Sequence, residues 1–343
     1  MTMAGPLPAT NNDRIVWDTY LAAYRLPVLT VADEVGTLAA LSAHALDTAA
    51  LAAQLSVNAR ALAIHLSLLA AMGFVERREG LWRATAEARR WLHPEAEGYC
   101  GPLIHGFRQS QPLHEQLLAT LRTGEKAEGH ASAAAEWERG DLPPELAVRI
   151  TAFMNAHSQA SARGVAMLPL FAEVRSLLDV GGGSGIFAIQ LARAWPRLRA
   201  TVMEIASVCA AADSYIAEAG VEGRVATQAV NMFTEAWPQG HDALFFSNVF
   251  HDWSEPTCQI LADKAFAALP SGGRILLHEM LLDDDHCGPL ATAAFSVLML
   301  LGTRGRQYSF AELRGMLEQA GFTQVETCET GGGYYSLVSA VKP

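Results

Sequence analysis

The stretch that decides the fold is residues 177–192, LLDVGGGSGIFAIQLA. A short apolar run carries Asp179 near its end, and glycines follow at positions 181, 183 and 185 before a second apolar segment. Glycine is needed where a backbone turns tightly and lets a ligand approach without a Cβ in the way. The stretch therefore predicts a buried strand, a ligand-binding turn built from Gly181, Gly183 and Gly185, and a helix that begins after the turn.

Apolar runs on both sides of this turn alternate with helical stretches. Alternation of this kind is typical of a mostly parallel sheet with helices on both faces. Ligands of such sheets bind outside the carboxyl ends of the strands, near the point where the strand order reverses. We predict strands at 176–180, 199–205, 224–230, 242–249 and 273–280, with two more near 323–329 and 334–341.

Two carboxylates accompany the glycine turn. Glu204 ends the next expected strand, where its side chain can accept both hydroxyls of a ribose. Asp179 stands just before the turn, where it can bind the ammonium group of a ligand. The fingerprint of dinucleotide-binding proteins would place a third glycine at position 186, which is Ile186 here. This departure disfavours a nicotinamide-dependent oxidoreductase.

Composition narrows the class of protein further. The length of 343 residues suggests two domains. The net charge of −11 gives a surface that does not attract the phosphate backbone of nucleic acids. Five scattered cysteines without a C-x-x-C pair fit reduced thiols, and no apolar run reaches the roughly 20 residues of a membrane span. With no signal-peptide pattern at the N-terminus, we expect a cytoplasmic protein.

The region 14–92 is rich in Ala and Leu at helical spacing and ends in a hairpin pattern, FVERREGLWRAT, with its turn near Glu79 and Gly80. Asp47 or Thr48 is expected to cap one helix, and Ser56 the next. Helix, turn, helix and hairpin together suggest a winged helix, which either binds DNA or serves packing and dimerisation. The second helix would read the DNA, but Arg60 is its only base, so we favour the second role.

At this point the sequence resembles the S-adenosylmethionine-dependent small-molecule O-methyltransferases, both the caffeic-acid type of plants and bacterial natural-product enzymes. The resemblance extends over nearly the whole chain. It implies transfer of a methyl group from S-adenosyl-L-methionine (SAM) to a hydroxyl, phenolic by expectation, of a small aromatic natural product, with S-adenosyl-L-homocysteine (SAH) as the other product and no metal. The motifs that carry it are LLDVGGGSG, the acid in TVMEI, VNMF, SNVFHDW, LPSGGRILLHE and AGFTQVE.

The resemblance also implies a division of the chain. We expect a disordered tail over 1–13, a winged-helix dimerisation domain over 14–100, and a helical linker and substrate-pocket region over 101–167, with one helix covering 145–167. A Rossmann-like methyltransferase domain with a seven-stranded, mostly parallel sheet would occupy 168–343. Because residues 14–92 are too apolar on their helical faces to stand as a solvated appendage, we expect a two-fold homodimer formed chiefly through the N-terminal domain.

Cofactor-binding roles follow residue by residue from the family pattern. The glycine turn would line the methionine and ribose of SAM, and Glu204 would bind the ribose. Asn231 and Met232 would meet the adenine, and Ser247 would make a polar contact to the cofactor. Many relatives have aspartate in place of Asn231, whose Oδ1 can still accept a hydrogen from the adenine amine.

The catalytic residues are expected at the end of the stretch FFSNVFHDW, residues 245–253. In the family pattern His251 is the general base. A phenol with a pKa of about 10 is mostly protonated at neutral pH, and a neutral imidazole can take its proton during attack. Glu279 matches a family acid that holds the base, whereas Gln307 stands where a second acid is expected. The side chain of Asp252 is expected to point away from His251, and Asp252 and Trp253 are both expected to be structural.

Several features remain open from sequence alone. Phe153, Met154, His157 and Met299 either belong to the core or form the wall of the acceptor pocket. The acidic run DDDHCG at 283–288 is interpreted as a solvated turn rather than a metal site. Within the class, the alternative is N- or C-methylation with His251 only positioning the substrate. Outside the class, it is a ligand-responsive winged-helix DNA-binding regulator.

Overall fold

The computed structural model describes residues 12–96, 99, 101, 112–125, 136–331 and 333–343. Its C-terminal half is built on a seven-stranded sheet with the order β5-β4-β3-β6-β7-β9-β8. The first five of these strands are parallel, and β9 pairs antiparallel with both β7 and β8. The strands are β3 (Ser176–Val180), β4 (Arg199–Glu204), β5 (Val225–Ala229), β6 (Ala243–Ser247), β7 (Arg274–Met280), β8 (Thr323–Glu329) and β9 (Tyr335–Val341).

All seven predicted strands are present, and the predicted fold class is confirmed. The largest difference is at β6, which ends at Ser247 rather than at 249. Asn248 adopts a left-handed backbone with φ of 56°, and a residue in that conformation cannot continue a strand. The strand order reverses between β3 and β6, so the carboxyl ends of these two strands flank the expected binding crevice.

Helices cover both faces of the sheet because its strands are apolar on both sides. Leu177 and Leu178 are neighbours on β3, yet they belong to two different hydrophobic clusters on opposite faces. The helices α10 (Pro144–Ala166) and α11 (Ile186–Ala194) contribute to one cluster, and α12 (Ala206–Ala219) packs beside them. The other cluster includes α13 (Glu255–Ala268) and α15 (Phe310–Gln319).

The N-terminal part contains the predicted helices and hairpin. Its elements are α1 (Arg14–Leu21), η1 (Ala22–Tyr24), α2 (Arg25–Glu34), α3 (Thr37–Ala43), α4 (Thr48–Leu55), α5 (Ala59–Ala71), β1 (Val75–Arg78), β2 (Leu81–Ala84), α6 (Ala86–Leu92) and α8 (Pro112–Thr123). Glu79 and Gly80 form the hairpin turn, both with positive φ. The helix α8 lies within the region 101–167 that we expected to form a helical linker.

Capping confirms one expectation for these helices and corrects another. Asp47 caps α4 through a hydrogen bond from the backbone N–H of Ala50. Ser56 does not cap α5, because it ends α4 in a left-handed conformation with φ of 54°. Asn58 caps α5 instead, and its side chain accepts the backbone N–H of Ala61.

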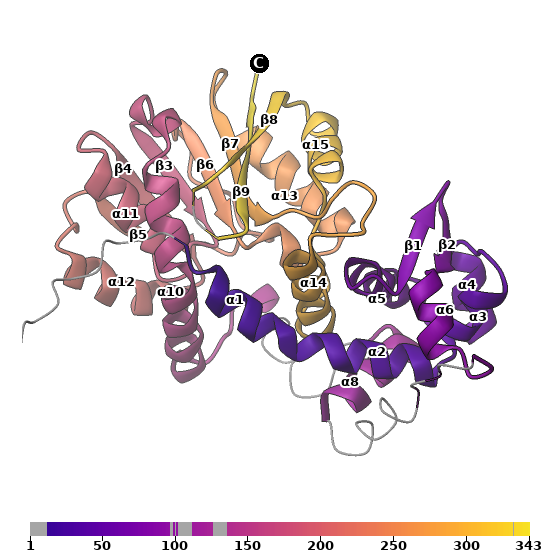
Figure 1. The fold of residues 1–343 in the computed structure, drawn as a ribbon. Coiled ribbons are helices and arrows are strands. Elements are labelled where there is room, and N and C mark those ends of the chain that lie inside the picture. Colours follow the sequence, from indigo (N-terminus) through magenta and orange to yellow (C-terminus); the bar gives the residue numbers. More distant parts are fainter. Residues whose placement is uncertain (1–11, 97–98, 100, 102–111, 126–135, 332) are drawn as a thin grey trace, which may run out of the picture.

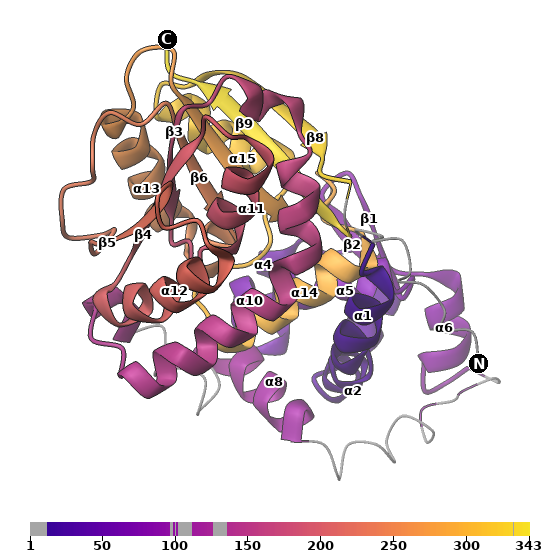
Figure 2. The same ribbon diagram turned by 90° about the vertical axis from the view of Figure 1, so that its left-hand side faces the viewer.

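One helix of the C-terminal half belongs to the N-terminal core. α14 (Leu290–Gly302) lies among α1, α5 and α8 in both views (Figures 1 and 2). Its buried side chains form one cluster with those of the N-terminal helices. This core crosses the boundary that we expected at residue 168, so the two parts of the chain share apolar contacts.

The same packing bears on the DNA-binding alternative. The helix α5, which would have to enter a DNA groove, packs against α14 of its own chain. Arg60, its single base, donates to the carbonyl oxygens of Arg304 and Gly305 at 3.4 and 3.3 Å. A helix occupied in this way offers neither a free face nor a free cation to a duplex.

Two expectations concern the tail and the membrane. Residues 1–11 of the expected disordered tail lie outside the described residues. Within the described ranges, no single helix is long and apolar enough to cross a bilayer, although the bent pair 14–34 and 37–43 passes on length and composition alone.

Candidate active site

The glycine turn follows β3 at the reversal point of the sheet. Gly181, Gly183 and Gly185 all adopt positive φ, between 56° and 73°. A Cβ on Gly181 would lie 2.9 Å from the side chain of Val249, which is closer than packed carbon atoms approach. The sequence therefore needs glycine here both for the backbone conformation and for space.

Two buried carboxylates face this turn. Glu204 accepts the backbone N–H of Gly183 at 3.3 Å through Oε1 and that of Ile205 at 3.0 Å through Oε2. Asp179 is completely buried, and neither of its oxygens has a hydrogen-bond partner among the described residues. Such a carboxylate is costly unless a ligand supplies hydrogen-bond donors, which fits the ammonium group and ribose hydroxyls of SAM.

Burial changes the acidity of both groups. It raises the pKa of Asp179 from 3.8 to about 7, and the nearby charge of Glu204 adds to the rise. Burial raises the pKa of Glu204 from 4.5 to about 7, while the N–H groups of Ile205 and Gly183 and the side chain of Trp137 work in the opposite direction. The site is thus prepared to lose protons when a donor-rich ligand arrives.

Met232 and Asn231 follow β5 and line the side of the crevice next to Glu204. The Asn231 oxygen that we expected to meet adenine already accepts the backbone N–H groups of Phe233 and Thr234, at 2.9 and 3.3 Å. Lys264 also holds this turn in place, because its Nζ donates to the carbonyl oxygens of residues 232, 233 and 235. Sequence reasoning missed Lys264, because no local motif links it to a turn so far away in the chain.

Ser247 ends β6 opposite the glycine turn and lines the same hollow as Asp179. Its hydroxyl lies 2.9 Å from Nδ1 of His278 on the neighbouring strand. Burial lowers the pKa of His278 to about 3, so this imidazole is neutral. His278 therefore fixes the direction of the Ser247 hydroxyl without placing a positive charge beside this hollow.

His251 lies in the short helix η3 (Phe250–Asp252), just after β6. Its Nδ1 lies 3.0 Å from Oε2 of Glu279, and the two side chains are only 5% and 3% exposed. The other oxygen of Glu279 accepts the backbone N–H groups of Val249 and Phe250 at 3.1 and 3.0 Å. One carboxylate thus holds both the imidazole and the backbone that carries it.

Gln307 is the second neighbour of the imidazole. It is completely buried, its Nε2 lies 3.0 Å from Nδ1 of His251, and its backbone N–H donates to Ser296 on α14. The structure therefore brings together His251, Glu279 and Gln307, which are far apart in sequence. A glutamine can orient the ring but adds no charge to it.

The expectation that Asp252 points away from His251 is wrong. Asp252 Oδ1 lies 3.7 Å from Nε2 of His251, and Asp252 and Trp253 both line the main cavity. Burial lowers the pKa of His251, but the charges of Glu279 and Asp252 more than offset this, so its pKa lies above the ordinary 6.5. The short helix η3 turns the two successive side chains to the same side, which a strand would not do.

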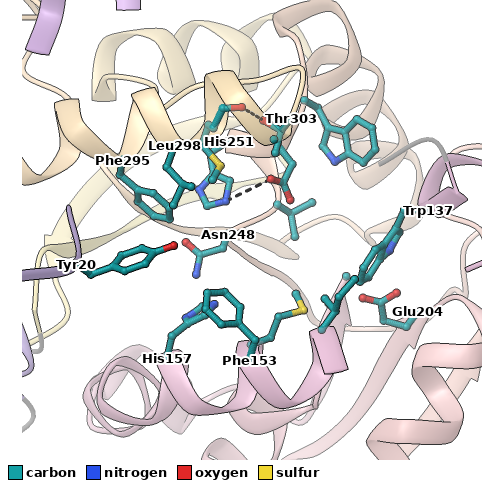
Figure 3. Close-up of a pocket in the computed structure, with 18 of the residues that line it drawn as sticks. Tyr20, Trp137, Phe153, His157, Glu204, Asn248, His251, Phe295, Leu298 and Thr303 are labelled. Atoms are coloured by element: carbon teal, nitrogen blue, oxygen red, sulfur yellow. Dashed lines mark hydrogen bonds and ion pairs between the residues drawn. The ribbon is translucent and has the colours of Figure 1, made fainter. Parts of the chain in front are cut away.

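The main cavity has a volume of about 320 Å³ and is mostly apolar (Figure 3). His251 and Glu204 both lie on its walls, so one cavity connects the proposed catalytic base with the proposed cofactor site. The four residues left open from sequence, Phe153, Met154, His157 and Met299, all line it. Sequence reasoning missed several further wall residues, for which no local signal exists: Trp17, Tyr20, Trp137, Ile150, Asn248 and Phe295.

Comparisons with known proteins agree with this geometry. A sequence model of the O-methyltransferase domain matches residues 114–323. The 3-hydroxy-5-methyl-1-naphthoate 3-O-methyltransferase of Streptomyces sahachiroi is 34% identical over 342 residues, which are 99% of this chain and 98% of that enzyme.

Solved structures show the same likeness. An O-methyltransferase family 2 protein from Planctomyces limnophilus, in complex with apigenin, has a TM-score of 0.87 and 26% identity over 98% of each chain. Human N-acetylserotonin methyltransferase, in complex with SAM, has a TM-score of 0.61 and 25% identity over 99% of each chain.

The fold and the site define a SAM-dependent methyltransferase. This chain belongs to the O-methyltransferase family, and it is a SAM-dependent O-methyltransferase. The prediction of an enzyme is thereby confirmed against the DNA-binding regulator and the oxidoreductase.

Proposed function

We propose that the enzyme transfers a methyl group from SAM to a phenolic hydroxyl of a small aromatic natural product, with His251 as the general base. The observation that carries this proposal is the buried Glu279–His251 pair, which opens onto an apolar cavity beside the glycine turn. The relative from Streptomyces sahachiroi is named for a hydroxylated naphthoate, and the Planctomyces limnophilus protein binds apigenin. Both are aromatic and fit a cavity of this character.

The residues around the glycine turn would hold the cofactor. Asp179 would accept from the ammonium group, Glu204 from the ribose hydroxyls, and Met232 would pack on the adenine. When bound there, SAM supplies an electrophilic methyl group that needs no further activation. The protein then has to bring the acceptor oxygen to within about 3–3.5 Å of that methyl carbon and remove its proton.

His251 is arranged for the removal of that proton. Glu279 beside Nδ1 favours a proton on this nitrogen, with the Gln307 amide turned so that its oxygen, rather than its NH2 group, faces that N–H. This tautomer leaves the lone pair of the imidazole Nε2 for the acceptor hydroxyl. As the imidazole becomes charged, Glu279 and Asp252 on either side of the ring stabilise the cation. Base catalysis of this kind contributes roughly 10²–10⁴-fold.

The acceptor would lie between aromatic walls. Phe153 and His157 from α10 face Phe295 from α14 across the cavity, with Tyr20 from α1 beside them (Figure 3). Burial lowers the pKa of His157 to about 4. A neutral His157 does not compete with His251 for a proton, and it can hydrogen-bond a second polar group on the acceptor.

The N-terminal part is proposed to be a winged-helix dimerisation domain, with the catalytic domain after residue 168. The helix α1 supports this assignment because it exposes Ile15 and Val16, which are 78% and 66% accessible. Apolar side chains gathered on one exposed helix are typical of an interface.

The test is a methylation assay with hydroxynaphthoates, flavones and matching aromatic amines, using SAM as the methyl donor and mass spectrometry to locate the methyl group. We expect an O-methyl product on a phenol, and none from the amines. A product methylated at nitrogen or carbon would overturn the proposal in favour of the same scaffold with His251 acting only to position the substrate.

A further inference from the structure

Residues 136–142, which we call the strap, lie beside the proposed cofactor site, and residues 136–139 are helical. The strap contains Trp137 and a turn at Gly140, where φ is 76°. At its far end Leu142 is buried in a cluster with Ile205 and Val208, which come one and four residues after Glu204 in the chain. The strap is thereby anchored on the ribose side of the crevice.

Asn231 fastens the strap at its middle. Its Nδ2 donates to the backbone carbonyl oxygen of Glu138 at 2.8 Å. Gly140 packs so closely against this amide that an added Cβ would lie 3.3 Å from Nδ2. The Asn231 amide is therefore tightly packed against Gly140, and a larger residue at position 140 would crowd it.

A second fastening joins the strap to the segment that carries the base. The carboxylate of Glu138 pairs with Arg304 at 2.7 Å, and the backbone N–H of Arg304 donates to the carbonyl oxygen of Asp252. Because Arg304 is 56% and Glu138 31% exposed, this ion pair stabilises the arrangement only weakly. Asn231 is accordingly the stronger of the two fastenings.

Trp137 connects the strap with both the main cavity and the proposed cofactor site. Trp137 lines the main cavity with His251 and also the hollow formed by Glu204 and Met232. Figure 3 shows its indole beside the Glu204 carboxylate, and the Trp137 side chain lowers the pKa of that carboxylate. A side chain held here stands over the place proposed for the ribose.

We infer that Asn231 is a positioning residue that fastens the strap over the cofactor, and not a ligand of adenine. The inference rests on the proposed cofactor site at the glycine turn. It explains the departure from the aspartate of many relatives, because a carboxylate has no N–H to donate to Glu138. It also explains why Oδ1 is already engaged by Phe233 and Thr234.

The variant Asn231→Asp distinguishes a residue that fastens the strap from one that only supports its own turn. The aspartate keeps an oxygen for the N–H groups of Phe233 and Thr234, so the turn is preserved. Its second oxygen then faces the carbonyl oxygen of Glu138, which repels it and releases the strap. A merely structural residue would lower the melting temperature of the free protein, whereas a fastening acts on cofactor exchange.

The experiment measures the dissociation of radiolabelled SAH by rapid filtration after a chase with excess unlabelled SAH. For Asn231→Asp we expect dissociation to be about tenfold faster, a KM for SAM raised to a similar extent, and kcat and melting temperature close to those of the wild type. Arg304→Gln, which breaks only the weaker fastening, should accelerate dissociation no more than about threefold.

The possible failures are distinguishable. If Asn231→Asp binds SAH as tightly as the wild type or more tightly, with unchanged dissociation, then Asn231 does not fasten the strap and the inference is overturned. Gly183→Val tests the site beneath it, because a valine in the turn should abolish SAH binding. If this variant still binds SAH, the proposed cofactor site is wrong and the inference fails with it.

Discussion

Oε2 of Glu279 lies 3.0 Å from Nδ1 of His251, while Oε1 of the same carboxylate holds the backbone N–H groups of Val249 and Phe250. Glu279 thus fixes the position of the imidazole and of the backbone just before it. Because one oxygen faces the imidazole and the other holds the backbone, a substitution at position 279 can remove the charge while preserving the position of the imidazole.

Replacing the base is the first test. His251→Ala should lower kcat by roughly 10²–10⁴-fold with little change in the Kd of SAH, because the side chain faces the acceptor. Activity should partly return at high pH, where the phenol ionises without help. If the variant keeps near-full activity on its own substrate, the assignment of His251 as general base is wrong.

Glu279→Gln should preserve the geometry and remove the charge. Its amide oxygen would take over the two backbone N–H groups, which turns the amide N–H₂ toward Nδ1 and favours the tautomer with a proton on Nε2. We expect kcat to fall by about 10²-fold or more, with unchanged SAH affinity. Because the pKa of His251 falls, the acid limb of the pH–rate profile should move to lower pH; an unmoved limb would contradict the ion pair.

Gln307→Glu should have the opposite effect on the same group. A carboxylate beside Nδ1 favours the charged imidazole, so the pKa of His251 rises further above 6.5. Since the base works only when neutral, activity is lost as the pH falls through this pKa, and the acid limb should move to higher pH. Gln307→Met, which has a similar shape without polar atoms, is the control and should not move the limb upward.

Cofactor binding should depend on pH near neutrality. The pKa values of Asp179 and Glu204 are raised to about 7 in the free protein, and donors from SAH would lower both. Binding then releases protons, so affinity is full above about pH 7 and weakens below it, by up to tenfold per pH unit for each group.

Titration calorimetry at about pH 6 and about pH 8, in buffers of different ionisation enthalpy, counts these protons. Asp179→Asn should bind SAH more weakly and release fewer protons. Affinity and proton release that do not change with pH would contradict the role of the two acids.

Assembly is tested on α1. We expect a two-fold homodimer in light scattering at micromolar concentration, and Ile15→Glu should give a monomer because it places a charge in the interface. Ile260→Glu is the matched control: Ile260 is also exposed, at 53%, but lies on α13 of the catalytic half. A wild type that already scatters as a monomer would sink the dimer proposal.

The sequence by itself determined the sheet, the glycine turn and the family. The apolar strand pattern, the glycine spacing and the acid at Glu204 are patterns among residues that are close together in the chain. Such patterns can be recognised without the tertiary structure. The resemblance to the family pointed to His251 and Glu279, through the motifs SNVFHDW and LPSGGRILLHE. The pairing of these two side chains follows from the parallel neighbours β6 and β7, whose carboxyl ends meet at one edge.

Only the tertiary structure decided what each polar side chain does. Asp252 turns toward His251 because Asn248 ends β6 with a positive φ and a short helix follows. The Asn231 side-chain oxygen accepts a hydrogen bond within its own turn, and its NH2 group donates to the carbonyl oxygen of Glu138, a residue far away in the chain. Tyr20 and Phe295 meet in one cavity because α14 is buried among the N-terminal helices. Contacts of this kind depend on how distant segments pack together, and no spacing within a single segment encodes them.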